Sequence, residues 1–323
     1  MTNSMTLFFA IIICFASYVI HLFVLQDIHP VTMNFVLFKS FDVSSLPFSA
    51  ILICNAIIYI LVGYLLIELN NRSDILRIRP FVLCAFYYLF VILCPELYLY
   101  SLANISLLAL IISLFFLFSS YQCYNSSSYL FHTFAVLSIG TLFFPQLMYL
   151  VPLWYIGASM MQSLNIRSFF AGILGFCLPY LLLLTCAVYV HQIEIFFVPF
   201  VELTNFGKMN IFAVMSIPNI ITLCFFIILF FISVIHCWLI DYDNKIRTRI
   251  ILHFIILLNF CILLFIVLQP KYELQLLSLF LPGNCLMTCH FFRRSSSRFS
   301  DYFFIIVIIL MILIYVFKMF SLY

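Results

Sequence analysis

Charge is scarce in this chain. Only 8% of its 323 residues are charged and 67% are hydrophobic, whereas a soluble domain carries about 25% charged residues. A water-soluble core cannot absorb that much apolar surface, so lipid must solvate most of the chain. The net charge of +3 gives no basic surface for nucleic acid. The sequence therefore predicts an all-α, polytopic transmembrane bundle.

The motifs of soluble enzymes are also lacking. No G-x-x-x-x-G-K-[ST], G-x-G-x-x-G, G-x-S-x-G or H-E-x-x-H occurs, which argues against ATP-driven transport by this chain alone. No C-x-x-C pair occurs among the twelve cysteines, which are scattered through apolar runs. Cys285 and Cys289, beside His290, have a spacing that one helix face can offer to a metal. We interpret these thiols instead as small buried packing groups.

Long apolar runs are abundant. A membrane-spanning helix needs about 20 apolar residues, and nine runs approach or reach that length. The expected spans are Met5–Leu25, Pro47–Ile67, Phe81–Cys94, Leu102–Phe118, Phe169–Val190, Ile217–Ile240, Ile250–Leu268, Leu276–Phe292 and Tyr302–Phe320. We expect the first of them to be an uncleaved span. Segment Tyr129–Gln162 is too long for one span and short for two.

The distribution of Lys and Arg decides how that segment folds. If Tyr129–Gln162 is a hairpin of two short helices that turns at Pro145, ten of the fourteen basic residues fall on one side, which is the cytoplasmic side in membrane proteins. We therefore predict about eleven spans in a single integral-membrane domain, 1–323, with a cytoplasmic N-terminus. The inner basic loops are 69–79, 163–168, 241–249 and 293–300. The outer loops are 26–46 and 191–214, and the second should hold a part-buried interfacial helix.

Two outer segments carry acids beside the membrane. Asp27 and His29 lie in QDIHP at the outer mouth of the first span, and Glu96 lies in CPELYLYS in a tight outer turn. A carboxylate at such a place can act as a general base or hold a divalent metal bound to phosphate. These three residues are the candidate catalytic residues. The alternative is that they are solvated loop and turn residues.

Polar residues inside the spans are the second group of candidates, because such residues are costly in lipid and often functional. The stretch LPGN (Leu281–Asn284) should break a span near the middle of the membrane, and broken helices mark substrate sites in transporters. Asn284 and Asn104 are the candidate substrate-binding residues. The alternative is a packing kink for the first and an interhelical hydrogen bond for the second.

Three stretches together resemble an uncharacterised family of multi-pass inner-membrane proteins from Bacteroidota. They are LNNRSDILRIRPFVLCAFYYLFVILCPELYLYS, LSIGTLFFPQLMYLVPLWYIGASM and NIRSFFAGILGFCLPYLLLL. Proteins of that family are sometimes labelled beta-carotene monooxygenases. An iron oxygenase of that kind needs several convergent histidines, and the seven histidines here are expected at both membrane faces. The resemblance therefore implies a bacterial inner-membrane location and no oxygenase.

The layout is also similar to that of the C-type membrane glycosyltransferases, which have many spans and an acidic first outer loop. The resemblance implies that Asp27 matches the first-loop acid and Glu96 a second acid, and that the substrate is a sugar on a polyprenyl phosphate. Asp27 lacks the acidic neighbour common in that family.

Three functions remain open from the sequence. The leading hypothesis is a glycosyltransferase-like enzyme that acts on a polyprenyl-phosphate-linked sugar at the outer face, with a divalent metal ion as a candidate cofactor and membrane lipid as its partner. The second is a transporter or flippase for a lipid or small solute. The third is a non-catalytic membrane subunit of a cell-envelope complex.

Overall fold

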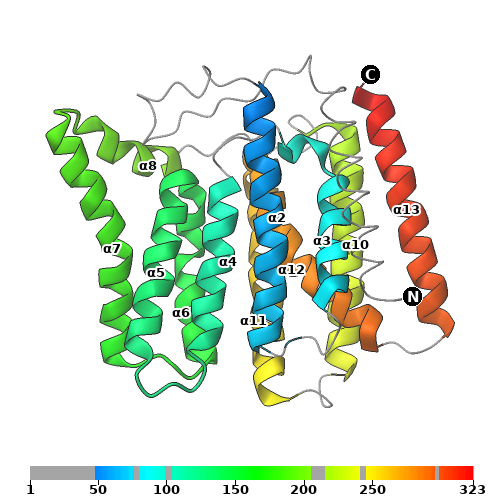
Figure 1. Ribbon diagram of the computed structural model, residues 1–323, viewed down its shortest axis with the longest axis horizontal. Coiled ribbons are helices and arrows are strands. Elements are labelled where there is room, and N and C mark those ends of the chain that lie inside the picture. Colours follow the sequence, from blue (N-terminus) through cyan, green and yellow to red (C-terminus); the bar gives the residue numbers. More distant parts are fainter. Residues whose placement is uncertain are drawn as a thin grey trace. The chain divides into compact units, whose positions relative to one another are not determined.

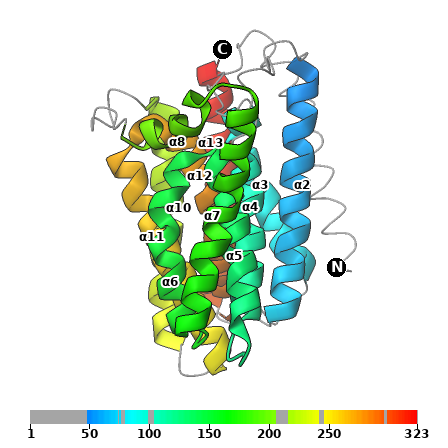
Figure 2. The ribbon, with the colours of Figure 1, turned by 90° about the vertical axis from the view of Figure 1, so that its left-hand side faces the viewer.

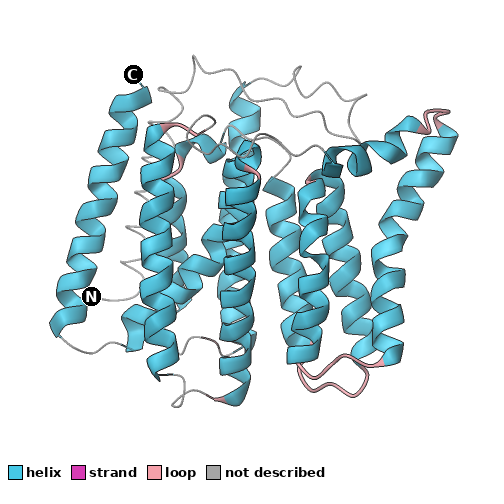
Figure 3. Cartoon of the chain, turned by 180° about the vertical axis from the view of Figure 1, so that it is seen from behind, coloured by secondary structure: helices cyan, strands magenta, loops and turns pink. Residues whose placement is uncertain are grey.

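The computed structural model describes residues 48–73, 75, 80–98, 104–204, 215–240, 245–294 and 298–322. All regular elements within these ranges are helices (Figure 3). The first expected span, Met5–Leu25, and the outer loop 26–46 lie outside the described residues. The chain divides into two compact units: unit 1 comprises Met1–Ile28, Leu66–Leu97 and Lys208–Tyr323, and unit 2 comprises His29–Leu65 and Tyr98–Gly207.

The helix bounds follow the apolar runs closely. The elements are α2 (Phe48–Ser73), α3 (Pro80–Ile92), η3 (Pro95–Tyr98), α4 (Asn104–Ser119), α5 (Ser126–Phe143), η4 (Pro145–Leu150), α6 (Val151–Met160), α7 (Ile166–Tyr189), α8 (Glu194–Thr204), α10 (Ile217–Ile240), α11 (Ile246–Leu268), η6 (Pro270–Tyr272), α12 (Glu273–Arg294) and α13 (Arg298–Leu322) (Figure 1). Within the described ranges, six helices are long and apolar enough to cross a membrane, and shorter apolar helices accompany them. The protein is therefore a multi-pass integral membrane protein, and the predicted all-α bundle is confirmed.

Unit 2 contains segment Tyr129–Gln162, which the distribution of Lys and Arg predicts to be a hairpin. Pro145 begins η4, and the chain turns there between α5 and α6. The two ends of the segment meet. Ser126 Oγ donates to the carbonyl oxygen of Ser163 at 2.6 Å, and the backbone N–H of Gln122 donates to the carbonyl oxygen of Met161 at 3.1 Å. The segment is thus the helical hairpin expected from its length and from the distribution of Lys and Arg.

Small residues and caps fix the helices around that hairpin. α5 and α7 lie side by side (Figures 1 and 2), and Gly175 of α7 lies against the backbone of Phe131 in α5. α7 begins with a capping box in which the Asn165 amide donates to Ser168 Oγ at 2.6 Å. α6 ends with Gln162 at a φ of 55°, in the left-handed conformation that closes many helices.

Unit 1 is built around α12, which packs against α3, α10 and α11. In the α12 span 94% of the residues are buried, against 22% to 50% in the other five long spans. α13 packs along α10. Burial of α12 on all sides shields its side chains from lipid, so its polar residues face other helices.

α8 is the helix expected in the outer loop 191–214. Its Phe196 and Phe200 pack against Tyr180 and Leu183 of α7, whereas Phe197 and Val201 are exposed. A helix buried on one side and apolar on the other is typical of a membrane interface.

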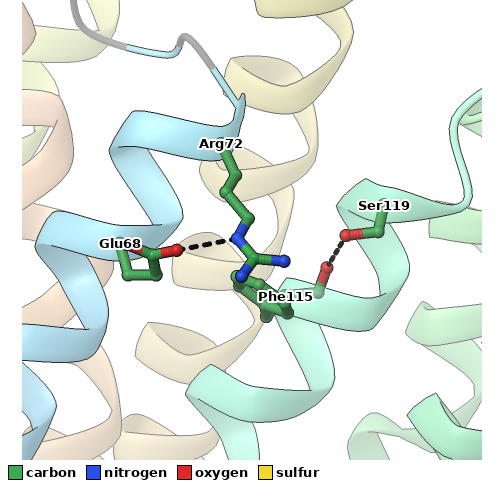
Figure 4. Close-up of polar contacts among 4 residues, drawn as sticks. All are labelled: Glu68, Arg72, Phe115 and Ser119. Atoms are coloured by element: carbon green, nitrogen blue, oxygen red, sulfur yellow. Dashed lines mark hydrogen bonds and ion pairs between the residues drawn. The ribbon is translucent and has the colours of Figure 1, made fainter.

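Polar side chains form hydrogen bonds near the ends of α2 and α4. Figure 4 shows two such contacts: Arg72 Nε donates to Glu68 Oε1 at 2.7 Å near the end of α2, and Ser119 Oγ donates to the carbonyl oxygen of Phe115 at 2.8 Å at the end of α4. The Arg72 side chain is 62% exposed, so an i,i+4 pair of this kind contributes only about 0.3–0.5 kcal/mol.

Candidate functional site

The candidate catalytic residues predicted from the sequence are only partly described. Asp27 and His29 lie outside the described residues, so their role stays a prediction. Glu96 lies in η3 of unit 1, directly after Pro95. Asn284 also lies in unit 1, on α12, whereas Asn104 lies in unit 2 at the start of α4.

Glu96 forms an ion pair with a lysine from the far end of the chain. Lys318 Nζ lies 2.8 Å from Glu96 Oε2, and the two side chains are 1% and 15% exposed. Lys318 belongs to the last turns of α13, which are otherwise apolar. A lysine is almost never fully buried unless it is paired, so Glu96 is the group that allows Lys318 to face inward.

A second carboxylate lies close to this pair. Glu273, the first residue of α12, interacts electrostatically with both Glu96 and Lys318. Its Oε1 accepts a hydrogen bond from Asn219 Nδ2 of α10 at 3.1 Å. Cys94, fully buried between α3 and η3, lies within the same electrostatic field. We call Glu96, Glu273, Lys318 and Asn219 the charged cluster.

The charged cluster gathers residues from four elements at one end of unit 1. In Figure 1 the turn η3, the start of α10 and the end of α13 all lie at the upper end of the drawing. Glu273 Oε2 and Asn219 Oδ1 are buried and have no hydrogen-bond partner among the described residues. A buried oxygen without a donor is costly, so each of these oxygens can accept a further hydrogen bond.

Sequence reasoning found Glu96 and missed the other three members of the cluster. Lys318 lies near the end of the expected span Tyr302–Phe320, and Glu273 lies three residues before the expected span Leu276–Phe292. Charges at span ends normally snorkel to the membrane surface. One feature of the sequence could have indicated the cluster: the predicted topology places all four residues on the same side of the membrane.

Below the cluster, α10 and α12 share a row of polar residues that we call the polar seam. On α10 the seam residues Asn219, Thr222 and Ser233 fall on one face with Phe226, by their three-, seven- and fourteen-residue offsets. On α12 the seam residues Glu273, Asn284 and Thr288 fall on one face in the same way. The two helices are joined along this line by the Asn219–Glu273 bond and by Asn284 Nδ2, which donates to the carbonyl oxygen of Phe226 at 3.3 Å.

The hydroxyls of the polar seam are satisfied within their own helices. Thr222, Ser233 and Thr288 each donate to the carbonyl oxygen four residues earlier, at 2.8 Å. Asn284 is fully buried, and its Oδ1 has no hydrogen-bond partner in the described part of the chain. Phe226 and Phe230 of α10 and Phe280 of α12 are also buried, and the rings of the last two meet edge to face at 5.7 Å.

The LPGN stretch does not break its helix, so that expectation from the sequence is wrong. α12 runs without interruption from Glu273 to Arg294, with Pro282 inside it. Gly283 instead provides close contact with α11. A Cβ built on Gly283 would lie 2.6 Å from Asn259 Nδ2, so only glycine allows this asparagine, which is fully buried, to pack there.

Asn104 belongs to a hydrogen-bonded network inside unit 2. Its Nδ2 donates to Asn55 Oδ1 at 3.0 Å, its Oδ1 accepts from the Tyr59 hydroxyl at 3.0 Å, and Asn55 Nδ2 donates to the carbonyl oxygen of Tyr98 at 2.8 Å. All four residues are buried. A network with these bonds ties α2, η3 and α4 together. The predicted role of Asn104 in substrate binding stays a prediction.

The residues that the structure describes contain no group of three or more His, Cys, Asp and Glu side chains placed to hold a metal ion. Cys285 and Cys289 are buried, and Cys285 Sγ donates to the carbonyl oxygen of Leu83 at 3.4 Å. A divalent metal at Asp27 remains a prediction, because that residue lies outside the described part.

No family model, no curated protein and no solved structure matches this chain. Function must therefore be inferred from the charged cluster and the polar seam themselves.

Proposed function

We propose that this multi-pass membrane protein is a transporter that moves a small polar solute along the polar seam between α10 and α12. The observation that carries the proposal is the contrast within unit 1. α12 is the most deeply buried of the six long spans and also has the lowest mean hydropathy among them. Because polar side chains inside a membrane are costly, they are retained mainly where a substrate or ion uses them.

The extent of the seam also supports transport. Glu273 and Thr288 are fifteen residues apart on one helix, which corresponds to about 22 Å, against a hydrocarbon thickness of about 30 Å. The polar groups thus follow most of the membrane thickness. The rings of Phe230 on α10 and Phe280 on α12 meet edge to face between the two helices. Alternating access would require these rings to separate.

Comparison of a gene-deletion strain with its parent tests the proposal. We expect one solute to be redistributed between cells and medium, as measured by mass spectrometry of both fractions. The wild-type gene should restore its distribution, and Asn284→Leu, which replaces the amide by two methyl groups in the same branched arrangement, should not. Leu286→Ile on the same helix is the matched control. An unchanged solute distribution in the deletion strain refutes the proposal.

A second candidate function is the glycosyltransferase-like reaction predicted from the sequence, in the bacterial inner membrane. Two observations favour it. Glu96 and Glu273 converge from separate elements on the side expected to be outer, and two such carboxylates form a catalytic constellation. α3 has 13 residues and is only about 20 Å long, so neighbouring lipid must thin or a lipid tail must enter there.

The deletion strain distinguishes the two functions. A glycosyltransferase defect leaves the polyprenyl-linked donor in the membrane fraction and removes a glycan from the cell envelope, whereas a transport defect changes a water-soluble solute. Full envelope glycan in an Asp27→Asn, Glu96→Gln double variant at normal protein level would exclude the enzymatic function.

A further inference from the structure

The charged cluster contains an uneven number of charges in a place where charge is costly. With both carboxylates ionised, Glu96 and Glu273 carry two negative charges and Lys318 one positive charge. One bound proton makes the cluster neutral. An uncompensated charge away from water is strongly disfavoured, so the neutral, singly protonated form is the one that fits this environment.

The contacts indicate which of the two carboxylates takes up the proton. Glu96 Oε2 lies 2.8 Å from Lys318 Nζ, so Glu96 has the cation as its direct partner. Glu273 receives only the neutral amide of Asn219, on Oε1. Its Oε2 is buried and without a hydrogen-bond partner among the described residues, as is Asn219 Oδ1.

These two oxygens belong to the same pair of side chains that already share one hydrogen bond. Asn219 donates through Nδ2 and has an unused acceptor, Oδ1, while Glu273 accepts through Oε1 and has an unused oxygen, Oε2. A proton on Oε2 removes the negative charge of Glu273 and turns that oxygen into a hydrogen-bond donor. The bond from Asn219 Nδ2 to Oε1 does not have to break.

The other groups around Glu273 do not compensate its charge. From α10 it meets the neutral Asn219, from η3 Glu96, from α13 Lys318, and from the segment before η3 the thiol of Cys94. Lys271 of η6 is exposed, with its Nζ over the Tyr272 ring at 5.3 Å to the ring centre. Among the residues that the structure describes, Lys318 is therefore the cation that acts on Glu273, and Glu96 already pairs with it.

We propose that the charged cluster is a proton-binding site, with Oε2 of Glu273 as the atom that takes up the proton, and that proton uptake there drives solute movement. The coupling rests on the proposed transport function, whereas proton binding at Glu273 does not. Loss of the proton places two carboxylates in competition for Lys318. That competition loosens the contacts of α13 and η3 with α10 and α12 at the end of the polar seam.

Infrared difference spectroscopy of the purified full chain in lipid nanodiscs tests proton binding. As the pH is lowered, we expect a carbonyl-stretch band of one protonated, non-hydrated carboxyl group. The band should be absent in Glu273→Gln, which resembles the protonated side chain and should fold. In Asn219→Leu the band should remain and move to higher frequency, because the amide contact is lost. Glu194→Gln, in an exposed position of α8, is the matched control and should keep the wild-type band.

Persistence of the wild-type band in Glu273→Gln, or the absence of any such band from the wild type, overturns the proton site. A second measurement separates the site from its coupling. In phosphatidylethanolamine and phosphatidylglycerol vesicles with an imposed pH gradient, wild-type accumulation of the solute identified in the deletion strain should fall to the level of protein-free vesicles in Glu273→Gln. If accumulation of the solute does not depend on the pH gradient, the coupling to protons is refuted and the transport function still stands. A titrating band without any solute movement refutes transport and leaves the proton site standing.

Discussion

Removing Lys318 should destabilise the protein more than any other single change at the charged cluster. At the observed Nζ–Oε2 distance of 2.8 Å, two unit charges attract by about 6 kcal/mol at an effective dielectric constant of about 20. Desolvation offsets much of this attraction, and breaking one partner of a buried pair costs about 3–5 kcal/mol. Lys318→Met leaves Glu96 and Glu273 facing each other without their cation. We therefore expect a loss in the free energy of unfolding of about 3–5 kcal/mol, or roughly two to four factors of ten in the unfolding equilibrium.

Glu96→Gln should cost less, because Lys318 keeps Glu273 as a nearby negative charge. The expected loss is about 1.5–3 kcal/mol, the range for a hydrogen bond to a charged group. The double variant Glu96→Gln, Lys318→Met removes both charges of the pair, and replacing a whole buried pair is often neutral. We expect its stability to lie within about 1–2 kcal/mol of the wild type.

Unfolding in mixed micelles, followed by circular dichroism as dodecyl sulfate is added, measures all four free energies. Lys271→Met is the matched control, because Lys271 is exposed and contacts only the Tyr272 ring among the contacts seen. It should cost no more than about 1 kcal/mol. Single variants within about 0.5 kcal/mol of the wild type, or a double variant equal to the sum of the singles, would refute the assignment of a coupled buried pair.

Three further substitutions test the packing. Gly283→Ala should cost about 1–3 kcal/mol, because the new Cβ meets the Asn259 side chain, and adding Asn259→Ala should recover part of that loss; no recovery would contradict the contact. Gly175→Ala should unfold more easily than Gly172→Ala, because the first meets the backbone of α5 and the second only side chains; the same micelle titration decides, and equal losses would argue against the close approach of α5 and α7. Asn104→Leu should cost about 1–3 kcal/mol by leaving its two hydrogen-bond partners unpaired, and wild-type stability would refute the network.

The membrane-spanning architecture followed from the sequence because lipid imposes simple requirements. A helix satisfies its own backbone hydrogen bonds, so an apolar run of sufficient length predicts a helix of nearly the same bounds. The expected span Ile217–Ile240 has the bounds of α10. Counting Lys and Arg on each side was enough to predict the hairpin at Pro145, which the contact between Ser126 and Ser163 bears out.

The LPGN stretch shows where local reasoning fails. Pro and Gly predict a break when each is considered alone. In the tertiary structure α12 continues through them, because neighbouring helices enclose it and Asn259 packs on Gly283. Whether a proline interrupts a membrane helix depends on what surrounds it, and a single sequence does not contain that information.

The sequence by itself determined that lipid surrounds most of the chain and where the helices lie. It also determined the hairpin at Pro145 and the position of Glu96 beside a membrane span, because each of these features depends on local composition. Only the tertiary structure decided that Lys318 turns inward to Glu96 and that Glu273 and Asn219 join them. The partners are up to 222 positions apart in the chain, and a charge at the end of an apolar run has the same sequence pattern whether it faces water or another helix. Packing alone distinguishes the two, since it removes water from one side of the residue and supplies a partner of opposite charge.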